Sequence, residues 1–229
     1  QRMDIGRGQM PLVFRRPVVL GMFCTWVALV CLLPGPGSAG ERRAFTTADL
    51  FSLQRISDPQ LSPDGQQVVF AAGTPDMDKN RVHQHLFMGK IKGSGVRQVT
   101  AGDLQATNGR FSTDGRGLYF LASAAGDRQQ VHRISLSDGK SEAVTDLPLD
   151  IDGFEVSPDG RFLILSMAVI PGKSPQETRA LLRERADRFG TGRQYERLPV
   201  RQWDAWRDGT RNHLFAYDLK DRAVRDLMG

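Results

Sequence analysis

The chain has 229 residues, with 31 lysines and arginines against 26 aspartates and glutamates, for a formal net charge of +5. This length allows one large domain or two small ones, with a sizeable core. Residues 1–40 hold four arginines and one aspartate, a net +3, so the other residues carry only +2. The charge therefore excludes a basic nucleic-acid-binding domain as the main interpretation.

The N-terminal segment has the pattern of a secretory signal peptide. A pair of arginines precedes the uncharged run 18–33, and small residues follow up to Ala39 and Gly40. We expect cleavage after Ala39 or Gly40, a secreted or periplasmic location, and no membrane contact after cleavage. The alternative is a membrane anchor, although the run is shorter than the roughly 20 residues that cross a bilayer. Both cysteines lie within 1–40, so the mature chain would have no disulfide and no cysteine nucleophile.

The next part, residues 41–55, predicts a short helix at about 48–55, capped by Thr46 or Thr47 and packed against the sheets that follow.

Residues 56–229 contain a repeat with a period near 48 residues. Each unit has a short strand, a turn of the form Ser-Pro/Thr-Asp-Gly, and an apolar strand. The repeated segments are 59–73, 108–123 and 153–167, and their turn aspartates are Asp64, Asp114 and Asp159. Proline presets φ for such a turn, aspartate bonds its own backbone, and glycine accepts positive φ. The aspartates could also suggest calcium, but the turn itself explains why they recur.

Third and fourth strands follow each hairpin in the first two units, at 83–92 and 95–101, and at 129–137 and 140–147. Four strands in about 48 residues are typical of one propeller blade. The predicted fold class is therefore all-β, a partial β-propeller of about three four-stranded blades. The third unit departs from the pattern, because its third strand is delayed to 212–220 by an insertion at 170–211.

The insertion begins with a predicted helix. Ser174 is the expected N-cap and Glu177 its capping-box partner three residues on. Leu182, Ala186 and Phe189 form an apolar stripe that we expect to dock the helix on the rim of the propeller.

The insertion ends with RQWDAWRDGTRNHLF at 201–215. Trp203 and Trp206 can fix the returning chain onto the blade, each burying a large apolar face. Alternatively, they line the mouth of the propeller, with Asp204 available to hold a cationic group such as a peptide amine. Both interpretations stay open.

The usual catalytic signatures are missing. No Gly-x-Ser-x-Gly elbow occurs, and the histidines show no convincing zinc spacing with a carboxylate. His83 and His85 could share one strand face and bind a metal, but this is the weaker interpretation. No Gly-rich phosphate loop precedes a helix, so we expect no cofactor.

Two stretches, FTTADLFSLQRISDPQLSPDG at 45–65 and LPVRQWDAWRDGTRNHLFAYDL at 198–219, resemble the N-terminal propeller of the prolyl oligopeptidase family of serine peptidases. The similarity is strongest to its acylaminoacyl-peptidase and dipeptidyl-peptidase branch. That branch commonly has His where this chain has Gln202. The resemblance implies an α/β-hydrolase domain with a Ser-Asp-His triad, short or N-acylated peptides as substrates, and a propeller that restricts access.

The family's dipeptidyl members often anchor the substrate amine with a glutamate on a propeller helix, which makes Glu184 and Glu196 candidates beside Trp203, Asp204 and Trp206. No triad is present in these residues, so we expect a truncated product or partial sequence that is inactive alone. The alternatives are a non-enzymatic periplasmic propeller that binds partner proteins, similar to that of the Tol system, or a three-blade fragment that must oligomerise.

Overall fold

The computed structural model describes residues 43–93, 95–124, 127–188 and 208–229, and the backbone of 201–202 and 205–206. The chain divides into two units, Gln1–Thr46 and Thr47–Gly229, and only 43–46 of the first unit are described. The predicted signal peptide lies outside the described residues. Among the residues that are described, no helix has the length and apolar character needed to cross a membrane.

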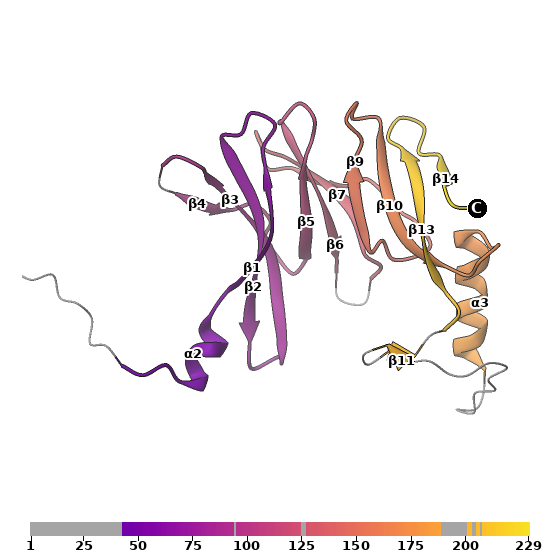
Figure 1. Ribbon diagram of the computed structural model, residues 1–229, viewed down its shortest axis with the longest axis horizontal. Coiled ribbons are helices and arrows are strands. Elements are labelled where there is room, and N and C mark those ends of the chain that lie inside the picture. Colours follow the sequence, from indigo (N-terminus) through magenta and orange to yellow (C-terminus); the bar gives the residue numbers. More distant parts are fainter. Residues whose placement is uncertain (1–42, 94, 125–126, 189–200, 203–204, 207) are drawn as a thin grey trace, which may run out of the picture. The chain divides into compact units, whose positions relative to one another are not determined.

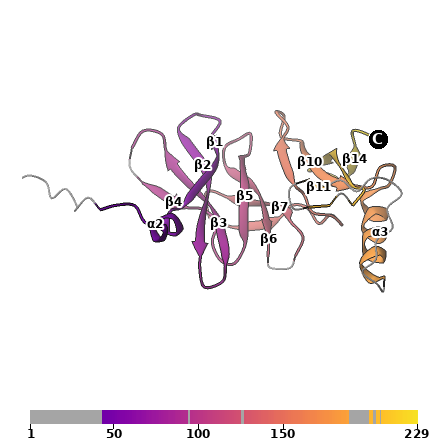
Figure 2. The same ribbon diagram turned by 60° about the horizontal axis from the view of Figure 1, so that its bottom comes forward.

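The second unit consists mainly of three four-stranded antiparallel sheets, in which strand order follows chain order. The first sheet contains β1 (Arg55–Leu61), β2 (Gln67–Asp76), β3 (Arg81–Lys90) and β4 (Val96–Gln98). The second contains β5 (Gln105–Phe111), β6 (Gly117–Ser123), β7 (Gln130–Ser135) and β8 (Ser141–Ala143). The third contains β9 (Gly153–Val156), β10 (Phe162–Val169), β13 (Arg211–Asp218) and β14 (Val224–Asp226). Figures 1 and 2 show them following one another along the unit.

Each predicted turn has the expected chemistry. Ser112 Oγ donates to Asp114 Oδ1 at 2.5 Å, and the Gly117 amide donates to Ser112 Oγ at 2.9 Å. The first and third turns repeat this arrangement, at 2.6 Å in both Ser62–Asp64 and Ser157–Asp159. The carboxylates are thus used within their own turns, which supports the structural interpretation of the three aspartates over the calcium one.

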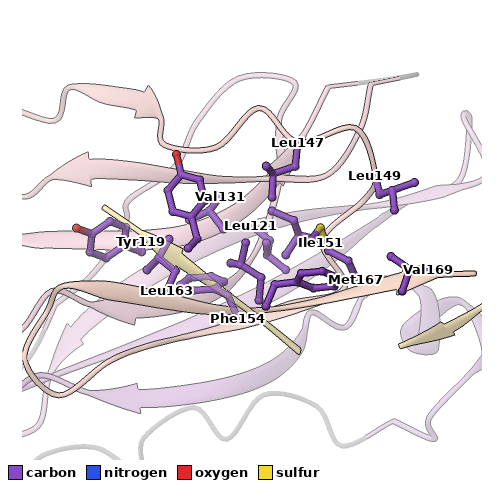
Figure 3. Close-up of a cluster of buried hydrophobic side chains, with 13 residues drawn as sticks. Tyr119, Leu121, Val131, Leu147, Leu149, Ile151, Phe154, Leu163, Met167 and Val169 are labelled. Carbon is purple, nitrogen blue, oxygen red and sulfur yellow. The ribbon is translucent and has the colours of Figure 1, made fainter. Parts of the chain in front are cut away.

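Two apolar clusters hold the sheets together face to face. The first joins β2 and β3 to β5, β6 and β7 through side chains such as Val69, Leu86 and Phe120, which are at most 1% exposed. The second joins the second sheet to the third, and Figure 3 shows its side chains from both, among them Leu121 and Leu163. Strand β10 alternates between half-buried and buried residues along its whole length, as a strand with one face in a core must.

The insertion leaves and rejoins the third sheet at one point. Strands β10 and β13 pair in unbroken register from Phe162–Asp218 to Val169–Arg211, so the 170–210 segment is one long hairpin connection. It contains α3 (Pro175–Asp187), β11 (Arg201–Gln202) and β12 (Ala205–Trp206).

The predicted capping box of α3 is confirmed, because Ser174 Oγ accepts from the Glu177 amide and the Glu177 carboxylate accepts from the Ser174 amide at 2.8 Å. Of the predicted apolar stripe, Leu182 packs against the second cluster, but Ala186 is exposed and Phe189 lies outside the described residues. Ala186 was therefore wrongly included in the stripe. The buried Thr178 fixes the helix to the end of β10, because its Oγ1 accepts from the Ile170 amide at 3.2 Å.

The N-terminal helix α2 spans Thr47–Ser52, shorter than the expected 48–55, since β1 begins at Arg55. It contacts β2, but none of its residues is buried. The fourth strands β4 and β8 are also shorter than predicted, with three residues each. Beyond β4 and β8, the amides of Val99 and Val144 still donate to the carbonyls of Leu86 and Val131, so the chain stays beside the third strand after the regular ladder ends.

Candidate functional site

Polar residues of the first strand of each sheet meet where these strands contact one another. Strand β5 contacts both β1 and β9, and each of these strands is an edge of its own sheet. Asp58 in β1, Arg110 in β5 and Glu155 in β9 meet there and form one ion-paired network. We name Asp58, Asn108, Arg110 and Glu155 the inner-strand cluster.

Two backbone irregularities position this cluster. Asp58 and Asn108 both have positive φ, 50° and 53°, and a register shift interrupts strand pairing next to each of them. Asn and Asp tolerate this left-handed conformation better than other residues that carry a Cβ. Each residue stands four positions before its turn serine, so the repeat produces the same bulge twice.

Arg110 is the centre of the cluster. Its Nη1 lies 2.8 Å from Asp58 Oδ2, and its Nη2 lies 2.8 Å from Glu155 Oε1, while Nε donates to Glu155 at 2.9 Å. Burial alone would lower the pKa of Arg110, but the hydrogen bonds that it donates to Glu155 and Asp58 raise it overall. Burial would raise the pKa of Asp58, but its bonds to Arg110, Gln60 and Asn108 lower it. Both groups therefore stay charged.

Asn108 makes a second connection between the same sheets. Its Nδ2 donates to Asp58 Oδ2 at 3.3 Å, and its Oδ1 accepts from the Phe154 amide at 3.1 Å. One residue of the second sheet thus binds both neighbouring sheets, as Arg110 does. The cluster offers fixed charges and hydrogen-bonding groups, but no nucleophile.

Two of the four histidines pair with carboxylates. His83 Nε2 lies 3.2 Å from Asp76 Oδ2 and His213 Nδ1 lies 2.9 Å from Asp226 Oδ2, and neither of these two histidines has a serine hydroxyl as a partner. Burial lowers the pKa of His85 and of His132. Within the described part of the chain no group of three or more His, Cys, Asp or Glu residues could hold a metal, so the weak metal interpretation of His83 and His85 gains no support.

Of the predicted substrate-binding residues, the structure describes Glu184 and the backbone of Trp206. Glu184 lies on α3 and its Oε1 accepts from Arg188 Nη2 at 2.8 Å, with both side chains well exposed. Trp206 belongs to β12, where its backbone pairs with Arg201 of β11. Trp203, Asp204 and Glu196 lie outside the described residues. The role of these five residues in substrate binding stays a prediction.

The inner-strand cluster was not predicted from the sequence, although a signal was present. Aligning the three units by their turn serines places Asp58 and Asn108 at the same position and Arg110 two residues later. A charged residue is a candidate for an ion pair when the residues beside it in its strand face a core. The pairing across sheets required knowledge of which strands are adjacent.

Consecutive four-stranded antiparallel sheets packed face to face define a propeller-like β protein. Comparison with solved structures agrees with this fold. The chain superposes on AtxE2 isopeptidase with a TM-score of 0.57 at 21% identity, over 81% of this chain and 32% of that one. It superposes on the acylaminoacyl peptidase of Pyrococcus horikoshii with a TM-score of 0.55 at 14% identity, over 78% and 25%.

Sequence comparison adds a relationship to peptidases. The chain is 30% identical to dipeptidyl-peptidase 5 of Porphyromonas endodontalis over 184 residues, which is 78% of this chain and 25% of that protein. No family model matches the sequence. The chain is thus related, over the part that aligns, to peptidases of the prolyl oligopeptidase family. It spans only 20% to 30% of the length of the curated relatives that it matches.

Proposed function

We propose that this chain is the N-terminal propeller portion of a secreted serine peptidase, and that the propeller restricts access of short peptides to an α/β-hydrolase domain outside these residues. The observation that carries the proposal is the 30% identity to a dipeptidyl-peptidase over 184 residues. That identity covers most of a chain whose described part is three packed sheets and an insertion. The whole protein would cleave short peptides through an acyl-enzyme.

The substrate class follows from the relatives. One is named a dipeptidyl-peptidase and another an acylaminoacyl peptidase, so the proposed substrates are short peptides with a free or an N-acylated amino end. Glu184, Glu196 and Asp204 are the carboxylates proposed to meet a free amine, and Trp203 and Trp206 the apolar walls beside it. A carboxylate binds an ammonium group through charge-assisted hydrogen bonds, which supports this assignment.

The proposal is tested on two proteins: the 229-residue chain, and the product of the gene if its reading frame continues. Each is given a dipeptidyl and an N-acyl-aminoacyl chromogenic substrate, with and without a serine-directed phosphonate. We expect no turnover by the chain alone and phosphonate-sensitive turnover by the longer product. Turnover by the chain alone, or a reading frame that continues without a Gly-x-Ser-x-Gly elbow, would contradict the proposal.

The restriction of access has its own measurement in the longer product. The rate on a dipeptidyl substrate should exceed the rate on unfolded casein by a large factor, since a casein chain cannot pass a narrow entrance. Asp204→Asn and Glu196→Gln should raise KM for free-amine substrates and leave N-acylated ones unaffected. Asp187→Asn on α3 is the matched control for a lost carboxylate, and a KM change equal to that of Asp204→Asn would contradict the assignment.

Secretion is a separate part of the proposal. Protein recovered from outside the cytoplasm should begin at Gly40 or Glu41 when its N-terminus is sequenced. If that protein still contains residues 18–33, the predicted cleavage is wrong and the membrane-anchor interpretation is favoured.

A further inference from the structure

Asn108 and Gly109 form the one Asn-Gly pair in the sequence, whose other two asparagines precede Arg81 and His213. Asparagine deamidates most readily before glycine, because glycine has no Cβ to hinder its amide nitrogen. In this reaction the Gly109 nitrogen bonds to Cγ of Asn108 and loses its proton, the Cγ–Nδ2 bond breaks, and ammonia leaves. Water then opens the cyclic imide at one of its two carbonyls and produces aspartate or isoaspartate.

The side chain of Asn108 is held by two neighbouring sheets. Asn108 lies in β5, which stands between β1 and β9 (Figure 1). Its Nδ2 donates to Asp58 Oδ2 at 3.3 Å, and its Oδ1 accepts from the amide of Phe154 at 3.1 Å. Ring closure requires Cγ to rotate toward the Gly109 nitrogen, and the loss of the planar amide ends both hydrogen bonds. Packing of the three sheets therefore opposes the reaction.

The backbone at Gly109 is held as well. Gly109 is buried, and a Cβ at this residue would lie 3.2 Å from Leu86 Cδ1 and 3.3 Å from Val69 Cγ2. Its carbonyl accepts from Arg110 Nη1 at 3.0 Å, and the same nitrogen binds Asp58. The peptide group that must move for the ring to close is thus fixed against the first sheet.

Neither product fits between the packed sheets. Aspartate at position 108 places a carboxylate oxygen where Nδ2 of Asn108 now faces Asp58 Oδ2, and two carboxylates this close repel each other. Isoaspartate takes Cβ into the main chain and so lengthens the backbone by one atom beside Gly109. The contacts of Gly109 with Leu86 and Val69 leave little space for that atom.

We propose that Asn108 is a deamidation site that the packed sheets protect, and that its products keep the sheets from packing again once they have separated. The reaction consumes only water and needs no enzyme or cofactor. Separation of the sheets therefore becomes irreversible with time, and the content of aspartate at position 108 records how long a chain has been open. The residues that protect Asn108 all lie within the three described sheets, and this inference does not depend on the proposed peptidase function.

The test follows the tryptic peptide of residues 98–110 by mass spectrometry while the whole 229-residue chain is incubated in mildly alkaline buffer. One sample is folded and the other is unfolded in guanidinium chloride. We expect deamidation of Asn108 to be at least about tenfold slower in the folded sample, because the reaction must wait for a local opening. Asn80, which is exposed and precedes Arg81, is the internal reference and should deamidate slowly in both. Equal rates at Asn108 in the two samples overturn the proposal.

Asp58→Ala releases Nδ2 of Asn108 and removes one carboxylate partner of Arg110. Deamidation in the folded chain should then be about tenfold faster, the ratio that corresponds to one lost charge-assisted hydrogen bond. Asp64→Ala is the matched control, because Asp64 accepts from Ser62 Oγ at 2.6 Å within a turn of the same sheet, and it should leave the rate unchanged. Equal acceleration by the two variants overturns the assignment of the protection to these contacts.

Asn108→Asp carries the first product and should unfold at a lower urea concentration than the unchanged chain. Asn80→Asp changes an exposed residue and should not. An Asn108→Asp variant as stable as the unchanged chain overturns the second half of the proposal. If Asn108→Asp does not fold, refolding of the aged, partly deamidated chain replaces it. The refolded fraction should contain less deamidated peptide than the fraction that stays unfolded, and equal contents contradict the proposal.

Discussion

Replacing Arg110 by methionine tests whether the inner-strand cluster stabilises the packing of the three sheets. The substitution keeps an unbranched apolar stem and removes the guanidinium that binds Asp58 and Glu155. The side chain of Arg110 is 14% exposed, so water cannot fully replace the lost donors. Asp58 then keeps its charge in a partly buried position with fewer partners.

The magnitude follows from the exposure of the two partners. A charge-assisted hydrogen bond contributes about 1.5 to 3 kcal/mol when buried. Glu155 is 66% exposed, so its ion pair adds little, and Asp58, at 31% exposed, gives less than the full value. We expect Arg110→Met to lower the free energy of unfolding by about 1.5 kcal/mol, taking the lower end of that range.

The measurement is urea unfolding followed by circular dichroism, with the slope m held common to the variants. Arg188→Met is the control, because Arg188 also lies 2.8 Å from a carboxylate, Glu184, but on an exposed helix face. The control should change little. If Arg110→Met costs no more than Arg188→Met, the reasoning that the cluster links the sheets is refuted.

The cost of Arg110→Met should also depend on pH. The folded-state pKa of Asp58 is lowered, so its carboxylate adds stability that is present above its unfolded pKa. That stability is lost as the pH falls from about 4 through the folded pKa. The difference in the free energy of unfolding between the unchanged chain and Arg110→Met should therefore be constant near neutrality and decrease in acid. An unchanged difference at low pH would contradict the assignment to Asp58.

Three further predictions use the same unfolding measurement. Ser112→Ala removes the hydroxyl that donates to Asp114 and accepts from the turn backbone, and should cost about 1 kcal/mol. Leu165→Ala in the second cluster, at 0% exposed, should cost about 3 kcal/mol by leaving a cavity. Burial and the neighbouring Asp150 raise the pKa of Asp152, so its charged form is penalised when folded, and Asp152→Asn should stabilise at pH 7 but not below pH 4.

Each of these predictions has a control of the same residue type. Ser137→Ala and Leu50→Ala change exposed residues and should have small effects. Asp221→Asn lies in an exposed turn and should not stabilise. If a control changes the free energy of unfolding as much as its partner variant does, burial does not explain the effect at that position.

The sequence predicted the sheets but not the inner-strand cluster. The turns at Asp64, Asp114 and Asp159 are local, because a hydroxyl, a carboxylate and a glycine within four residues determine them, and all three are as expected. The helix start at Ser174 is local for the same reason.

The inner-strand cluster and the edges of the elements depend on distant residues instead. Arg110 and Asp58 are 52 positions apart, and only the packing of one sheet on the next brings them together. Helix α2 ends at Ser52, earlier than the predicted end at residue 55, because Arg55 already belongs to β1. Propensity cannot anticipate such competition between elements.

The unbroken pairing of Val169 with Arg211 makes the insertion a replaceable module. A two-residue turn could join these strand ends directly, leaving every hydrogen bond of the third sheet in place. Among the described residues, the loss would include the packing of Leu182 against the second cluster. Relatives could therefore exchange this hairpin connection for others of different length and chemistry, and change what the molecule recognises without redesigning the sheets beneath it.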